Sequence, residues 1–149
     1  MSTHVKHMRR ALELARLQHG RTGVNPSVGC VLLDRDGAKI SEAATGDGGR
    51  PHAEQIALAR LPMGAAAGGT AYVTLEPCRQ RSTDEAACSQ RLLEAGVARV
   101  FIATLDPHPN GSGGLKRLLE AGITIETGLL QTEADALYID FFASVSNGG

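Results

Sequence analysis

Apolar residues recur at three- and four-residue steps near the start of the chain, with charged residues between them. This spacing continues from about residue 3 to residue 19 and is typical of an amphipathic helix that ends at Gly20. An apolar stretch at residues 28–33 predicts a buried strand, and Asp36-Gly37 favours a tight turn into a second strand at about 38–45. We therefore predict a helix that covers one face of a sheet, followed by an antiparallel hairpin.

Later in the chain, helical spacing alternates with short stretches rich in β-branched residues. Residues 52–59 have the composition of a helix, and residues 71–75 are typical of a strand that Pro77 ends. A nearly identical heptapeptide then occurs twice, at residues 91–97 and 117–123, and each copy combines a helix end, a glycine and the start of a strand. Such helix-to-strand units imply parallel strands joined by right-handed crossovers.

These elements predict an α/β fold, a three-layer α/β/α sandwich with a mixed sheet of about five strands and helices on both faces. The last two strands are expected at residues 97–103 and 123–125, and a terminal helix at about 130–143. Because 149 residues suffice for one hydrophobic core, we expect residues 1–149 to form a single domain.

Composition and charge favour some classes of function and argue against others. With 42% hydrophobic and 21% charged residues, the chain has a globular composition. A net charge of −1 lacks the basic field that a duplex-binding protein needs, which favours a small-molecule substrate and argues against nucleic acid. Three cysteines fit a reducing compartment, so we expect a cytoplasmic protein. We also expect neither a membrane helix nor an export signal.

The chemistry-bearing residues lie at two predicted loop-to-helix junctions. His52 and Glu54 open one helix, and from its first turn both can reach around an ion placed beyond the helix N-terminus. Cys78 follows Pro77, and Cys88 lies further along the same break between a strand and a helix. A thiol at a helix start ionises more readily, and the thiolate is the form that binds zinc. The sequence therefore predicts a zinc site made by one imidazole and two thiolates.

Three protein ligands leave one tetrahedral position open, which is typical of a catalytic zinc with a bound water whose pKa is roughly 7. Glu54 would take a proton from this water, pass it to a ring nitrogen of the substrate and later deliver one to the departing amine. The predicted reaction replaces an exocyclic amino group by a carbonyl and releases ammonia.

The pattern of His52-x-Glu54 with Pro77-Cys78 and a later cysteine resembles the zinc-dependent cytidine-deaminase superfamily. Nine residues separate Cys78 from Cys88, a gap that is similar to the deaminase domain of the riboflavin-biosynthesis deaminase/reductase. The resemblance covers about residues 8–142. Further matching stretches are Asn25–Cys30, Pro51–Glu54, Thr74–Cys78, Ala95–Val100 and Asp106–Pro109.

The resemblance implies a cytidine-deaminase-like fold, Zn²⁺ as cofactor, and at least a homodimer. It also implies that the Asn25 amide contacts the substrate ring or orients the pocket, and that the Ala53 backbone contacts the carbonyl side of the base. The implied substrate is an aminopyrimidine, first of all the diaminopyrimidinone ribosyl nucleotide of riboflavin biosynthesis. No reductase-like unit is recognised. We therefore expect either that another chain reduces the product or that this deaminase serves a different pathway.

The loop between the two cysteines departs from the family. The family usually has Ser-His-x-Gly-Arg-Thr-Pro-Pro there, whereas residues 79–87 are one residue longer and lack that pattern. Arg79 and Arg81 are candidates to bind a phosphate, or they form a solvated loop with Asp84 and Glu85. His108 is a candidate for the mouth of the pocket.

Alternative functions remain open at this point. The same chemistry could act on a free base or nucleoside of the cytosine, guanine or triazine type. A polynucleotide-editing deaminase and a non-catalytic zinc scaffold are the remaining alternatives. Cys30 is expected to fill the core, and Glu76 to support the site rather than to react.

Overall fold

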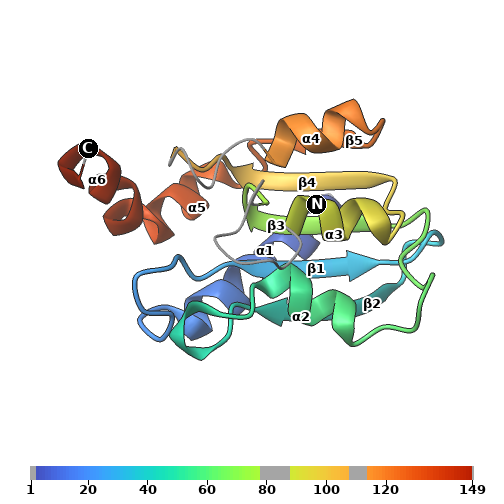
Figure 1. The fold of residues 1–149 in the computed structure, drawn as a ribbon, viewed down its shortest axis with the longest axis horizontal. Coiled ribbons are helices and arrows are strands. Elements are labelled where there is room, and N and C mark those ends of the chain that lie inside the picture. Colours follow the sequence, from blue (N-terminus) through green and yellow to red (C-terminus); the bar gives the residue numbers. More distant parts are fainter. Residues whose placement is uncertain (1–2, 78–87, 108–113, 149) are drawn as a thin grey trace.

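The computed structural model describes residues 3–77, 88–107 and 114–148. Its centre is one five-stranded sheet with the strand order β2-β1-β3-β4-β5 (Figure 1). Strand β1 is antiparallel to both β2 and β3, whereas β3, β4 and β5 are parallel to one another. The strands are β1 Gly29–Leu33, β2 Lys39–Ala44, β3 Thr70–Leu75, β4 Arg99–Thr104 and β5 Thr124–Thr127. The predicted hairpin and the mixed sheet are confirmed.

Helices cover both faces of this sheet (Figure 1). Helices α2, α3 and α4 pack over one face, and α1 and α5 over the other. The described helices are α1 Thr3–Gln18, the 3-10 turn η1 Asp47–Gly49, α2 Ala53–Ala59, α3 Cys88–Glu94, α4 Gly114–Glu120, α5 Gln131–Leu137 and α6 Ile139–Gly148. The predicted three-layer α/β/α fold is thereby confirmed.

The hydrophobic core has two parts because β1 is buried on both faces. Cys30 and Leu32 point to the side of α2, and Val31 and Leu33 point to the side of α1. Successive side chains of a strand alternate between the faces, so a strand between two helical layers is apolar throughout. This explains the uninterrupted apolar stretch at this point of the sequence.

Helix α1 approaches the start of β1 so closely that only glycine fits there. A Cβ atom at Gly29 would overlap the carbonyl oxygen of Ala11. Four side chains of α1 are buried against the sheet, namely Met8, Ala11, Leu12 and Ala15. The amphipathic helix that the spacing predicted is therefore confirmed, with its apolar stripe on the sheet.

The prediction of one terminal helix is wrong. Two helices, α5 and α6, meet at Tyr138, whose backbone (φ −101°, ψ 12°) departs from helical geometry. The Tyr138 side chain is buried and bonded to residues far away in the sequence. The apolar spacing continues through the break, so the periodicity could not show it.

Within the residues that the structure describes, no helix combines the length and apolarity needed to cross a membrane.

Candidate active site

Two of the three predicted zinc ligands lie side by side. His52 immediately precedes α2 in an extended conformation (φ −70°, ψ 156°), and its imidazole does not cap that helix. Cys88 is the first residue of α3 and is fully buried. The distance from His52 Nδ1 to Cys88 Sγ is 3.3 Å. Two helix starts that are distant in the sequence therefore bring an imidazole nitrogen and a thiol sulfur together.

This separation fits a shared metal ion. With Zn–N and Zn–S bonds of about 2.1 Å and 2.3 Å in a tetrahedron, a nitrogen and a sulfur ligand stand about 3.6 Å apart. The observed 3.3 Å is close to that value. Within residues 3–77, 88–107 and 114–148, His, Cys, Asp and Glu form no group of three that could hold a metal. Cys78, the third predicted ligand, lies outside the described residues.

Glu54 lies in the first turn of α2 and is directed into the protein rather than toward solvent. It is only 3% exposed. Its charge helps to raise the pKa of the Cys30 thiol on β1, although burial of that thiol is the main cause. Burial also raises the pKa of the Tyr138 hydroxyl, with a smaller contribution from Glu54. The carboxylate is therefore enclosed by protein, two residues from His52 in the sequence.

Cys30 and Ala53 occupy the core beneath α2, and both are fully buried. The structure thus confirms that Cys30 fills the core. Ala53 begins α2, and the N–H groups of a first helical turn have no acceptor within the helix. The predicted contact of its backbone with the substrate stays a prediction.

Asn25 lies in the loop between α1 and β1 and is half-buried. Its Nδ2 donates a hydrogen bond to the carbonyl oxygen of Gly49 at 3.2 Å. A Cβ atom at Gly49 would come within 2.5 Å of that nitrogen, and its φ of +97° also favours glycine. Asn25 therefore joins its loop to the segment that leads into His52, and its predicted substrate contact stays a prediction.

Glu76 holds together the carboxyl ends of two parallel strands and the start of α4. Its side chain is buried and accepts hydrogen bonds from Asp106 N at 3.1 Å and Leu115 N at 3.2 Å. The Glu76 N–H donates to Thr104 O at 3.0 Å. These contacts agree with the supporting role expected for Glu76.

Replacing Glu76 with glutamine should lower the free energy of unfolding by roughly 1–3 kcal/mol, because one backbone N–H loses its buried acceptor. Denaturant unfolding measures this loss. The matched control is Glu120→Gln on the exposed face of α4, which should change stability by less than about 0.5 kcal/mol. Equal losses in the two variants would contradict the bridging role.

Arg79, Arg81 and His108 lie outside the described residues, as Cys78 does. Their predicted roles stay predictions. Thr74 and Tyr138 join β3 and the C-terminal helices to the loop of Asn25, and no sequence pattern predicted this connection. A buried aromatic residue in a predicted helix gives no signal of a distant polar partner, so only the fold revealed them.

Residues 1–104 match the family described as cytidine and deoxycytidylate deaminase zinc-binding region. The chain belongs to this family. The match includes His52, Glu54 and Cys88, and the description of the family as zinc-binding agrees with the separation of His52 from Cys88. The resemblance stated from the sequence is confirmed.

Curated relatives in the family are named for riboflavin biosynthesis. The riboflavin biosynthesis protein RibD of Escherichia coli is 43% identical over 143 residues, covering 95% of this chain and 38% of the relative. A diaminohydroxyphosphoribosylamino-pyrimidine deaminase of Buchnera aphidicola is 38% identical over 143 residues, covering 95% of each chain. The chain thus spans well under half of the RibD relative and nearly all of the shorter one.

A solved structure shares the fold closely. The diaminohydroxyphosphoribosylaminopyrimidine deaminase/5-amino-6-(5-phosphoribosylamino)uracil reductase of Thermotoga maritima has a TM-score of 0.90 and 33% identity. The similarity covers 97% of this chain and 42% of that chain. The likeness therefore extends over the whole α/β/α sandwich.

Proposed function

We propose that this chain is a zinc-dependent hydrolytic deaminase that converts an exocyclic amino group of an aminopyrimidine to a carbonyl and releases ammonia. The observation that carries the proposal is the 3.3 Å approach of His52 to Cys88, with the buried Glu54 two residues from His52. The names of the relatives support the diaminopyrimidinone ribosyl nucleotide of riboflavin biosynthesis as the substrate.

The proposed zinc ligands are His52, Cys78 and Cys88. One nitrogen and two sulfurs form the donor set of a catalytic zinc with an open position, and zinc held there would make water a better nucleophile at neutral pH. Cys88 supports this assignment because its side chain is fully buried and its Sγ lies 3.3 Å from His52 Nδ1.

Glu54 is the proposed proton carrier. Its carboxylate would accept a proton from the attacking water and give it to a ring nitrogen of the substrate. It would then take the remaining proton from the hydroxyl group on the tetrahedral carbon and give it to the amino group, so that the carbonyl forms as the carbon–nitrogen bond breaks and ammonia leaves. Burial supports this role, because a carboxylate enclosed by protein exchanges protons with the substrate rather than with bulk solvent.

Substrate contacts are proposed for five residues. The Asn25 amide and the Ala53 backbone border the His52 segment and are proposed to contact the base. Arg79 and Arg81 are proposed to bind the phosphate, and His108 to lie at the mouth of the pocket.

Ammonia release from a panel of heterocycles tests the proposal. The panel contains the diaminopyrimidinone ribosyl nucleotide, its dephosphorylated form, deoxycytidylate, cytosine and guanine. We expect the ribosyl nucleotide to be used with a kcat/KM about 100-fold above that of the free bases, because charged contacts to phosphate contribute strongly to binding. Turnover of free bases alone would contradict the proposal that the ribosyl nucleotide is the substrate. The absence of turnover with every compound would contradict the proposal that the protein is a deaminase.

The remaining expectations stay predictions. We predict a homodimer or higher homo-oligomer, a single deaminase domain in residues 1–149, and a cytoplasmic protein that does not bind nucleic acid. Light scattering of the purified protein measures the oligomeric state. A tight, salt-sensitive complex with transfer RNA would instead support a polynucleotide substrate.

A further inference from the structure

Tyr138 connects the C-terminal helices to the opposite end of the sequence through a chain of hydrogen bonds. Its hydroxyl donates to the carbonyl oxygen of Ser27 at 2.7 Å and lies 2.6 Å from Thr74 Oγ1. Because a phenol has one hydrogen, Thr74 is the donor in the second bond. Thr74 Oγ1 in turn accepts from the Gly29 N–H at 3.0 Å. These three hydrogen bonds lead from Gly29 N–H through Thr74 and Tyr138 to Ser27 O, and we call them the Tyr138 relay.

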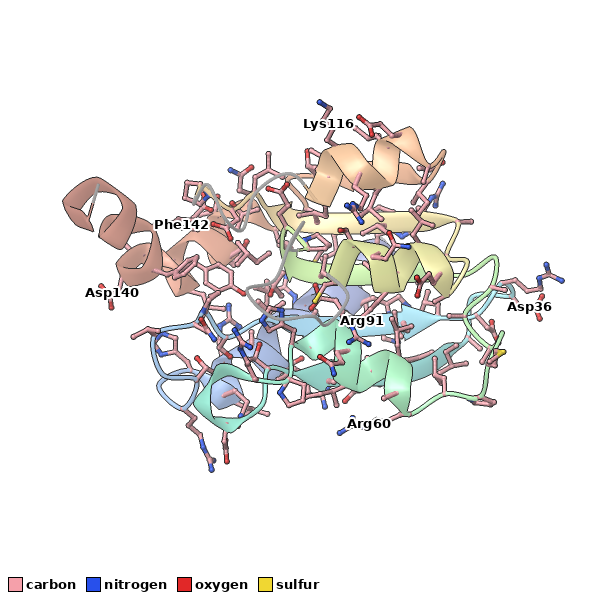
Figure 2. The ribbon with its side chains drawn as sticks, viewed as in Figure 1. Asp36, Arg60, Arg91, Lys116, Asp140 and Phe142 are labelled. Carbon is pink, nitrogen blue, oxygen red and sulfur yellow. The ribbon has the colours of Figure 1, made fainter. Side chains whose placement is uncertain are left out.

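The Tyr138 relay is enclosed by protein. Tyr138 is 2% exposed, and burial raises the pKa of its hydroxyl, so it stays protonated and can donate. Phe142 covers it from the next turn of α6, with 5.8 Å between the ring centres. Figure 2 shows Asp140 and Phe142 at the start of α6, where Phe142 packs against the core on the side of α1. Water therefore does not replace the buried bonds of the relay easily.

The relay ends on the loop that carries Asn25. Within this loop Thr22 Oγ1 donates to the Asn25 carbonyl oxygen at 2.7 Å. Asn25 Nδ2 then donates to Gly49 O at 3.2 Å, three residues before His52. The contact of Tyr138 with Ser27 is thus two residues along the backbone from Asn25, which in turn contacts Gly49 ahead of α2.

Packing alone does not set the position of this loop. A cavity of about 350 Å³ lies between the loop and the C-terminal helices, and Asn25, Tyr138 and Phe141 are among the residues that line it. Val24 is 96% exposed. The loop borders a cavity on one side and solvent on another. Its position therefore depends more on hydrogen bonds than on side-chain packing.

We propose that Tyr138 is a positioning residue of the active site, whose hydroxyl sets the place of the Asn25 loop through Ser27 and Thr74. This inference rests on the proposed deaminase function. Asn25 is a proposed substrate contact, whereas His52 and Cys88 are held at the starts of α2 and α3. Loss of the relay should therefore weaken substrate binding and leave the metal in place.

The test compares two tyrosines that lose the same atom. Tyr138→Phe should raise KM about tenfold, change kcat by less than about threefold and leave the zinc content unchanged. Tyr72→Phe is the matched control, because Tyr72 belongs to the same core cluster and its hydroxyl contacts His4 Nδ1 at 2.6 Å, away from the loop. Its KM should equal that of the wild type.

Two variants of Thr74 test the relay from its other end. Thr74→Val should raise KM as Tyr138→Phe does, whereas Thr74→Ser keeps the hydroxyl and should restore the wild-type KM. If Tyr138→Phe does not fold, the two Thr74 variants still test whether the relay affects substrate binding. A wild-type KM in Tyr138→Phe or in Thr74→Val would overturn the inference while the deaminase function stands. A wild-type protein without deaminase activity would overturn the proposed function itself, and this inference with it.

Discussion

Replacing Glu54 with glutamine should lower kcat by about 10³- to 10⁴-fold while zinc stays bound. Glutamine has nearly the same shape but cannot accept and release a proton near neutral pH, and a well-placed acid–base group contributes up to about 10⁴-fold. The buried position of Glu54 in the first turn of α2 gives bulk water little access to take over its role. Steady-state kinetics on the ribosyl nucleotide, with zinc analysis of the same preparation, measure both quantities.

The matched control is Glu42→Gln. This carboxylate lies on β2 and pairs with Arg10 and Lys39. The Arg10 guanidinium in particular lowers the pKa of Glu42 to about 2, so Glu42 is ionised at neutral pH. It therefore resembles a proton-accepting carboxylate in charge but lies on β2 rather than on α2. Its kcat should stay within about twofold of the wild type. If Glu54→Gln kept more than about a tenth of the wild-type kcat, Glu54 would not be the proton carrier, and another group would have to move the proton.

Replacing Cys88 with alanine should remove zinc and abolish deamination. With two of three protein ligands left, the site loses most of its affinity, and the bound fraction should fall from about one zinc per chain to almost none. Metal analysis after dialysis and an ammonia assay measure the two effects. We also expect a lower melting temperature, because metal that binds the folded state stabilises it.

Cys30→Ala distinguishes ligation from packing. Cys30 and Cys88 are both fully buried, and each substitution removes one sulfur atom from the core. Cys30→Ala should cost on the order of 1 kcal/mol of stability and keep both zinc and activity. If Cys88→Ala retained a full complement of zinc, the proposed ligand set would be incorrect whatever its effect on the rate.

The elements of the site could be predicted because their signals are local. Residues 52–59 have the composition of a helix, which set the start of α2 to within one residue, with His52 just before it. The apolar stretch at residues 28–33 predicted a strand between two layers, and β1 is that strand. The second heptapeptide predicted the end of α4 and the start of β5 for the same reason, since a helix end, its glycine and the next strand lie within a few residues.

The break between α5 and α6 could not be predicted. Apolar residues continue at helical spacing on both sides of Tyr138, so the sequence favoured one helix. The tertiary structure favours two, because Tyr138 is buried where its hydroxyl reaches Ser27 and Thr74. A burial site with two distant polar partners can outweigh the preference of the backbone for a continuous helix.

By itself, the sequence determined the α/β layers, the parallel and antiparallel strands, and the residue types of a deaminase motif at two helix starts. These depend on periodicity, turn residues and short motifs, all of which act over a few neighbouring positions. Only the tertiary structure decided that His52 and Cys88, 36 residues apart, approach to 3.3 Å, and that Tyr138 bonds to Ser27 across 111 residues. The physical reason is that a hydrogen bond or a shared metal requires atoms within a few ångströms, and the packing of helices on the sheet sets such distances between remote segments.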